Sequence, residues 1–239
     1  MQVTRDQHPV EMAELFKPPL NIRLNRLWLK PLFRLLFNIL GRVKITGREN
    51  IPFGTSYLIA INHISIYDPP LVLSFWPEES EAIGATDVFE KKFQGTILRL
   101  YGVVPVHRGD YDRSLIDTML AILKSRRPLT IAPEGGRSHV PALRQAKPGV
   151  GYIIERSHAP VLPVGLIGTT DDFWQRARRG EKPSLEIRIG KLIDFSQQPV
   201  QHSERRVLRQ SNADLVMRHI AGLLPEEYHG VYAGQAILP

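Results

Sequence analysis

The sequence predicts an α/β fold, with a single domain built on a central mixed sheet flanked by helices and preceded by an N-terminal amphipathic helical segment at a membrane interface. Three observations predict it. The 239 residues are enough for one domain with a sizeable core. Short apolar runs of strand length alternate with helical stretches. A long apolar segment edged by basic residues comes before them.

The N-terminal segment has the pattern of an interfacial helix. After a break at Lys17-Pro18-Pro19, the segment from Leu20 to Leu40 is largely apolar outside one set of regularly spaced polar residues. No acidic residue occurs between Leu15 and Arg48, and Pro31 predicts a kink or a split. The polar residues recur every three or four positions, so they fall on one stripe of a helix, and they are Arg23, Arg26, Lys30, Arg34 and Asn38.

Two interpretations of this helix remain open. It lies in a lipid surface, or it packs against the domain core while its few basic residues reach out to solvent. A helix that docks with one side and dips into lipid with the other satisfies both. No apolar run reaches the roughly 18 residues of a spanning helix, so we expect a peripheral or monotopic protein of the cytoplasmic face. The residues expected to contact lipid are Arg26, Trp28, Lys30, Phe33, Arg34 and Phe37.

The rest of the chain divides into predicted strands and helices. The expected strands are Val43–Thr46, Tyr57–Ile61, Ala82–Ala85, Val103–Val106, Leu129–Ala132, Val161–Leu166 and Leu185–Ile189. The expected helices are Pro69–Phe75, Gln94–Tyr101, Arg113–Lys124, Val150–Arg156, Phe173–Arg178 and Glu204–Leu223. Pro163 predicts an edge or distorted strand. We therefore expect a membrane-association segment over 1–41, a catalytic domain over 42–225 and a C-terminal tail over 226–239.

Composition narrows the chemistry. The chain has no cysteine, which excludes disulfides, thiolate metal sites and a cysteine nucleophile. Its net charge of +7 favours polyanionic partners such as anionic lipid, phosphorylated substrates or nucleic acid. The basic residues accompany an apolar helical surface, and no nucleic-acid motif is recognisable, so we expect no nucleic-acid partner.

A histidine and an aspartate follow the expected strand Tyr57–Ile61. In a continuous helix His63 and Asp68 would point roughly 140° apart, so they meet only across a turn. Asp68 before Pro69 suits a helix N-cap, which would let its carboxylate fold back to the imidazole. Such a pair fixes the tautomer and lets the other ring nitrogen accept a proton. Alternatively Asp68 is only a cap and His63 only a loop residue.

Two further groups of residues suit anion binding. Arg108 ends an expected strand, where it clamps a phosphate or is simply a solvated charge. The stretch Pro133–Ser138 places a glutamate, two glycines and an arginine after another strand, and paired glycines let backbone amides approach an anion. No Gly-x-Ser-x-Gly occurs, which argues against covalent serine catalysis at Ser65.

Together these pieces resemble the blocks that mark the glycerolipid acyltransferase family, which includes the lysophosphatidate acyltransferases. The resemblance spans roughly residues 41–167. His63 through Asp68 looks like the family's His-x4-Asp block. The family's other three blocks have similar segments in this chain at Gly102–Arg108, Pro133–Ser138 and Val161–Pro163.

The resemblance implies transfer of an acyl group from acyl-CoA or acyl carrier protein to a glycerol-type hydroxyl of a lysophospholipid. No bound cofactor and no metal are expected, and the membrane surface is expected to be anionic. His63 would be the general base and Asp68 its orienting partner. Glu134 and the Gly135 amide would organise the acceptor pocket. The residues expected to bind substrate are Arg108, Glu134, Gly135, Gly136, Arg137, Ser138 and Lys147.

Two departures from the family pattern affect the acceptor. The third block usually has a threonine where this chain has Gly136, and Thr86 stands where many members have a lysine. A different polar lipid or glycolipid acceptor is therefore an alternative. A membrane-binding adaptor that keeps the fold without the chemistry is a second one.

Overall fold

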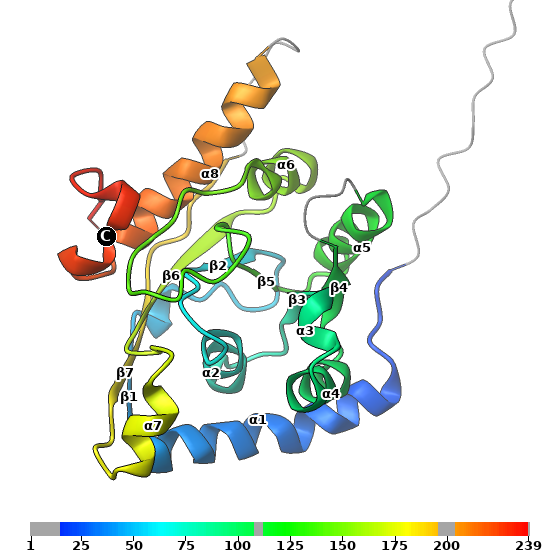
Figure 1. The fold of residues 1–239 in the computed structure, drawn as a ribbon. Helices are drawn as coiled ribbons and strands as arrows, with labels where there is room; N and C mark the ends of the chain where they lie inside the picture. The colour runs from blue at the N-terminus through cyan, green and yellow to red at the C-terminus, as the bar shows by residue number, and fades with distance from the viewer. Residues whose placement is uncertain (1–14, 108–111, 196–203, 239) are drawn as a thin grey trace, which may run out of the picture.

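The computed structural model describes residues 15–107, 112–195 and 204–238 (Figure 1). The helices are α1 (Leu20–Leu40), α2 (Asp68–Phe75), α3 (Thr86–Phe89), α4 (Lys92–Tyr101), α5 (Arg113–Lys124), α6 (Pro148–Ser157), α7 (Phe173–Arg178) and α8 (Arg205–Ala221). The strands are β1 (Arg42–Thr46), β2 (Leu58–Ile61), β3 (Glu81–Ala85), β4 (Val104–Val106), β5 (Leu129–Ile131), β6 (Val161–Ile167) and β7 (Ser184–Ile189). Short 3-10 turns occupy Arg48–Asn50, Glu226–Tyr228 and Gly230–Tyr232.

The strands form one seven-stranded mixed sheet in the order β1-β7-β6-β2-β5-β3-β4, which confirms the predicted fold class. All pairs are parallel except β6 with β7. The strands β6, β2, β5, β3 and β4 therefore present their carboxyl ends at the same edge. Ligand sites of open α/β sheets lie at that edge.

Pro163 lies on β6, which is an interior strand, so the expected edge position is wrong. Val164 pairs with Ile189, whereas Val161 pairs with Ile193. The two pairs are three residues apart on β6 and four residues apart on the segment that it faces, so that segment carries one extra residue. This bulge lies where the proline's missing N–H would have faced β7. The carbonyl of Pro163 still accepts from Gly190 N at 2.9 Å.

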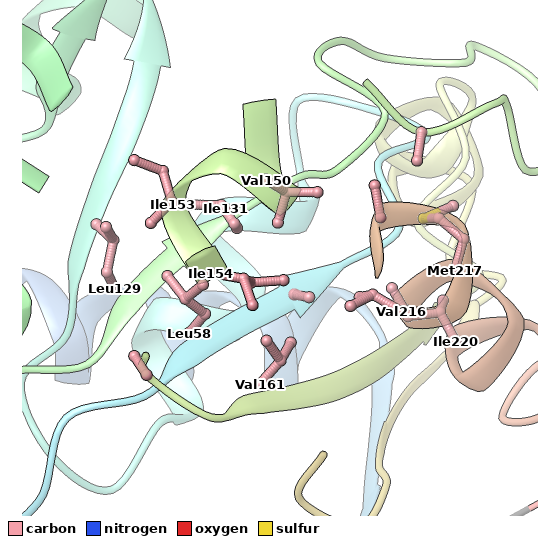
Figure 2. Close-up of a cluster of buried hydrophobic side chains, with 14 of the residues drawn as sticks. Leu58, Leu129, Ile131, Val150, Ile153, Ile154, Val161, Val216, Met217 and Ile220 are labelled. Carbon is pink, nitrogen blue, oxygen red and sulfur yellow. The ribbon is translucent and has the colours of Figure 1, made fainter. Parts of the chain in front are cut away.

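The sheet is buried on both faces by helices. Helices α5, α6 and α8 cover one face, and α2 and α7, with the C-terminal half of α1, contribute to the cluster on the other. Alternate residues of β2 point to opposite clusters, which explains its unbroken apolar run. Figure 2 shows the first cluster, where α6 and α8 meet the sheet through Leu58, Leu129, Ile131, Val150, Ile153, Ile154, Val161, Val216, Met217 and Ile220.

Helix α1 crosses one side of the domain, next to α2, α4 and α7 (Figure 1). It continues through Pro31, so the predicted split does not occur. Its basic stripe faces the protein. The Arg26 side chain is 1% exposed, and its guanidinium makes a two-point ion pair with Glu81 at 2.9 and 2.6 Å. Its Nε also donates to the carbonyl of Tyr101 at 2.8 Å.

Two other basic side chains of the stripe also reach the domain, whereas Arg23 is exposed. Lys30 donates to the carbonyls of Trp76 and Glu78, and Arg34 donates to the carbonyl of Ser74. The expectation that a packed α1 would send its basic residues to solvent is therefore wrong for Arg26, Lys30 and Arg34, whereas it holds for the exposed Arg23. Of the residues expected to contact lipid, Arg26 and Phe37 are buried, Lys30 and Phe33 are half-buried, Arg34 is tied to α2, and Trp28 is exposed.

The apolar side chains on the opposite side of α1 are exposed. They form a continuous strip along the helix, which we call the outer face of α1. Its members are Leu20, Leu24, Leu27, Trp28, Leu32, Leu35, Leu36 and Ile39. Among the described helices, none is long and apolar enough to cross a bilayer.

The predicted domain boundaries do not separate independent parts. Leu29 and Phe37 of α1 belong to the core clusters, so helix α1 contributes to the fold. Residues 226–237 also pack on the domain, where Tyr228 and Tyr232 join the cluster beneath α6 and α8. The expected C-terminal tail is therefore part of the domain.

Candidate functional site

The candidate site lies at the carboxyl ends of β2, β5 and β6. Asn62 follows β2 and is buried. Its amide accepts from Leu166 N at 2.7 Å and donates to the carbonyl of Leu166 at 2.9 Å, so it pairs with β6 as a further strand residue would. This pairing fixes the point at which the chain leaves the sheet, immediately before His63.

The structure brings His63 and Asp68 together across the turn between β2 and α2. His63 Nδ1 lies 2.9 Å from Asp68 Oδ2, and the same oxygen accepts from the backbone amides of Ile64 at 2.6 Å and Ser65 at 2.8 Å. Asp68 is buried, whereas the His63 side chain keeps 15% of its surface exposed. The imidazole is thus held at one nitrogen by a carboxylate that cannot move, and its other nitrogen, Nε2, is the one that can act on a substrate.

Asp68 differs from the predicted N-cap by one position. Tyr67 occupies the cap position, and Asp68 is the first residue of α2, followed by Pro69 and Pro70. Its carboxylate closes the preceding turn instead of capping the helix, because it accepts amides on the N-terminal side. Asp68 Oδ1 is buried without a hydrogen-bond partner among the described residues.

The buried side chain of Glu134 connects two loops through hydrogen bonds. Its Oε1 accepts from the backbone amide of His63 at 2.8 Å, and its Oε2 accepts from the amide of Arg144 at 3.0 Å. Because both oxygens accept backbone amides, the geometry favours a role in holding the two loops, and the expected direct role in the acceptor pocket stays a prediction. Burial raises the pKa of Glu134 to about 7, although the hydrogen bonds from His63 and Arg144 oppose that rise.

The raised pKa of Glu134 predicts how stability changes with pH. A carboxyl whose folded pKa lies above its unfolded value stabilises the fold fully below pH 4.5, and this contribution is lost as pH rises through about 7. Relative to Glu134→Gln, the free energy of unfolding of the wild type should therefore fall by about 3 kcal/mol as the pH rises from 4.5 to above 7. Urea unfolding from pH 4 to 8 measures the difference. Glu155→Gln is the control, because the Arg209 hydrogen bond lowers the pKa of Glu155 and reverses the sign. The prediction is contradicted if the difference in unfolding free energy between the wild type and Glu134→Gln stays the same from pH 4 to 8.

The stretch after β5 forms a turn and a long loop that returns to α6. Gly135 N donates to the carbonyl of Ala132 at 3.0 Å, so this amide belongs to the turn and the expected contact with an acceptor is wrong. The φ angle of Gly135 is +68°, and a Cβ there would lie 3.0 Å from Lys147 Cγ. Glycine is needed at this position. Gly136 is buried.

The loop is tied back to the turn between β2 and α2 that carries His63. Ser138 N donates to the carbonyl of His63 at 2.8 Å, and His139 N donates to the carbonyl of Ile64 at 3.1 Å. Arg137 is half-buried, and its carbonyl accepts from Arg144 Nη1 at 3.0 Å. These bonds place Arg137 and Ser138 beside His63.

Two predicted substrate-binding residues remain, and the structure describes only Lys147. Lys147 is exposed at the start of α6, and its amide donates to the carbonyl of Pro133 at 2.8 Å, which brings it next to the Gly135 turn. Arg108 lies outside the described residues. It follows His107, which is exposed beyond the end of β4.

Sequence reasoning missed several residues that build the site through the backbone. Asn62 pairs β2 with β6, and Tyr228 and Tyr232 support the loop from the C-terminal end of the chain. A polar residue directly after the apolar strand was the signal for Asn62. The two tyrosines are more than 80 residues away from the loop that they hold, and no local pattern marks them.

Comparison with known proteins places these residues in one family. The model of the family described as Acyltransferase matches residues 42–167, which include the turn with His63, the turn with Glu134 and strand β6.

Three curated relatives are named 1-acyl-sn-glycerol-3-phosphate acyltransferase. The Bacillus subtilis protein is 27% identical over 56% of this chain and 67% of its own length. The Borreliella burgdorferi protein is 26% identical over 64% of this chain and 62% of its own length. A chloroplastic protein of Brassica napus is 30% identical over 54% of this chain, and the match spans 38% of that relative.

A solved structure has a similar fold. The crystal structure of the 1-acyl-sn-glycerophosphate (LPA) acyltransferase from Thermotoga maritima has a TM-score of 0.56 and 22% sequence identity. The similarity covers 82% of this chain and 78% of that one. It shows that the sheet and its flanking helices share one architecture.

Proposed function

Because the chain belongs to the Acyltransferase family, we propose that it moves an acyl group from a thioester to the hydroxyl of 1-acyl-glycerol-3-phosphate or a related lysolipid. The contact between His63 Nδ1 and Asp68 Oδ2 at 2.9 Å carries the proposal. The names of the curated relatives support the acceptor class.

His63 acts as the general base. Its Nε2 takes the proton of the acceptor hydroxyl while the oxygen attacks the thioester carbonyl. The C–O bond forms, the C–S bond breaks, and the departing sulfur takes the proton back from the imidazolium. Asp68 Oδ2 holds the Nδ1–H tautomer and stabilises the positive charge on the ring during the step. No acyl-enzyme is formed.

The acceptor phosphate binds on the side of the loop that follows β5. Arg137 and Lys147 lie on this loop, and Ser138 is bonded through its amide to the catalytic turn. Arginine binds phosphate at two points and lysine as a point charge, which suits them to this role. We assign the same role to Arg108 from the family resemblance. Glu134 positions the loop.

The acyl donor is acyl-CoA or acyl carrier protein, used as a co-substrate and not as a bound cofactor. A thiol-release assay with both donors against a panel of acceptors tests the proposal. The panel contains lysophosphatidate, other lysophospholipids and a glycolipid, because Gly136 and Thr86 depart from the family pattern. Thiol release that depends on lysophosphatidate supports the proposal, whereas release only with a glycolipid would favour the second acceptor class. No release with any acceptor would favour the adaptor.

The outer face of α1 is proposed to rest on the membrane from which the acceptor is taken. The face is apolar and exposed, which suits a helix lying at the level of the lipid head groups. The net charge of +7 supports an anionic surface. The protein would then be peripheral or monotopic on the cytoplasmic face.

Two charges placed on the outer face should abolish most of this binding. Leu27 and Leu35 are 70% and 57% exposed, so Leu27→Glu with Leu35→Glu should leave the fold intact. We expect binding to anionic vesicles to fall at least about tenfold, because apolar burial is lost and an anionic surface repels carboxylates. Vesicle co-sedimentation is the measurement.

The matched control places the same charges elsewhere. Val207 on α8 and Val231 near the C-terminus are 73% and 58% exposed, so Val207→Glu with Val231→Glu changes the net charge equally. If both double variants lose binding to the same extent, the outer face is not the contact. Removal of residues 1–41 is a poorer test, because Arg26, Leu29 and Phe37 are part of the core.

A further inference from the structure

The chain beyond α8 returns to the candidate site. We call residues 225–237 the C-terminal segment. It contains the turns Glu226–Tyr228 and Gly230–Tyr232, and it lies outside the stretch matched by the family model, which ends at residue 167. Ile237 N donates to the carbonyl of Arg218 at 3.0 Å, which anchors the end of the segment on α8.

The segment grips Leu143 through the backbone. Leu143 N donates to the carbonyl of Tyr228 at 2.8 Å, and the carbonyl of Leu143 accepts from Val231 N at 3.2 Å. A Cβ on Gly230 would lie only 2.2 Å from the oxygen of Leu143, so the two chains touch backbone to backbone. Leu143 itself is buried. Both polar backbone groups of this loop residue are therefore taken up by the C-terminal segment.

Ala146, which directly precedes Lys147, is held in the same way. Its amide donates to Tyr232 Oη at 2.9 Å, and its carbonyl accepts from Gln210 Nε2 at 3.1 Å. The side chains of Tyr232 and Gln210 both contact Asp214. Tyr232 Oη donates to Asp214 Oδ1 at 2.6 Å, and Gln210 Nε2 lies 3.1 Å from the same oxygen. Tyr232 is buried. Burial raises the pKa of its hydroxyl, and the hydrogen bond to Asp214 raises it further.

Tyr228 connects the segment to the loop after β6. Its hydroxyl accepts from Gly168 N at 3.2 Å. Burial raises the pKa of Tyr228, although the hydrogen bond from Gly168 opposes that rise. The C-terminal segment thus contacts both loops that border His63.

We infer that the C-terminal segment positions the acceptor side of the site, and that Tyr232 is a positioning residue for the acceptor lipid. Leu143 and Ala146 are held by this segment and α8, while Arg144 between them is held by Glu134. Lys147 follows directly. The turn that carries His63 is also held by Asp68, whose contacts with His63, Ile64 and Ser65 do not involve the loop. Loosening of residues 143–147 should therefore weaken acceptor binding before it affects the chemical step. This inference rests on the proposed function, because that function supplies the acceptor.

Tyr232→Phe tests the inference, because it removes one hydroxyl and keeps the ring. The buried amide of Ala146 then loses its acceptor, which favours opening of the loop. The KM for lysophosphatidate should rise about tenfold, while kcat and the KM for the acyl donor change less than about threefold. Amide hydrogen exchange over residues 140–147 should also become faster.

Tyr101→Phe is the matched control. Tyr101 is equally buried, and its hydroxyl donates to the carbonyl of Ser80 at 3.0 Å beside α1, away from the loop. It should leave the acceptor KM and the exchange over residues 140–147 unchanged.

Three outcomes separate the possibilities. An unchanged acceptor KM in Tyr232→Phe, or an equal rise in Tyr101→Phe, overturns the inference. Unchanged exchange over residues 140–147 in Tyr232→Phe also overturns it, and this readout needs no turnover. A wild-type protein that transfers no acyl group to any acceptor refutes the proposed function instead, and the exchange comparison still decides whether Tyr232 holds the loop.

Discussion

Replacement of His63 by alanine is expected to lower kcat for acyl transfer by at least about 10²-fold, because the variant loses the imidazole that takes the proton of the acceptor hydroxyl. The fold should survive. Among the described residues the imidazole bonds to Asp68, and the turn keeps the amide bonds from Ile64 and Ser65 to the same carboxylate. Thiol release under saturating donor and acceptor measures the loss. Transfer at a wild-type rate would refute general-base catalysis by His63.

The companion variant is Asp68→Asn, which separates charge from geometry. Three donors converge on Oδ2, and Oδ1 has no partner among the described residues. An asparagine can therefore place its oxygen at the Oδ2 position and its NH₂ at the vacant side, which keeps the tautomer of His63. Only the negative charge is lost. We expect an intermediate loss of roughly 10- to 100-fold, smaller than that of His63→Ala.

Arg26→Met should give the largest loss of stability. The side chain of Glu81 is fully buried and would keep only Arg127 as an ionic partner, while the carbonyl of Tyr101 would lose its donor. Burial disfavours the charged guanidinium, but the hydrogen bond and the charge of Glu81 outweigh burial, so the pKa of Arg26 is raised. Breaking such a pair costs about 3–5 kcal/mol. The free energy of unfolding in urea measures it.

Arg23→Met on the same helix is the control for Arg26. Arg23 is exposed, so the same substitution should change stability by less than about 0.5 kcal/mol. A loss at Arg26 that does not exceed the loss at Arg23 would mean that the buried ion pair does not hold α1 on the domain.

Most of the secondary structure was predictable from local patterns, although the short helix α3 was not expected. Each predicted strand is present within one residue at either end, because buried parallel strands are short apolar runs such as Leu58–Ile61. The contact between His63 and Asp68 was predictable because the turn and the two prolines leave the carboxylate little choice of direction. The interior position of Pro163 was not, because the bulge that accommodates it depends on pairing with Ile189 and Ile193.

The orientation of α1 was not predictable from its own sequence. A basic stripe on an apolar helix has the same spacing whether the stripe faces water or protein. Glu81, which begins β3 far along the chain, decides the matter by offering a buried counter-charge to Arg26. The engagement of Glu134 by two backbone amides is equally invisible, since amides occur at every residue. The same reason hides the role of Tyr232.

The outward leucines of α1 also affect how the protein behaves in a test tube. In plain buffer the strip has no lipid to cover it, and two molecules can bury their strips against each other. An assembly size measured in plain buffer would then report this artificial pairing. Light scattering repeated with detergent above its micelle concentration removes the driving force, and it is under that condition that subunit number and specific activity should be compared.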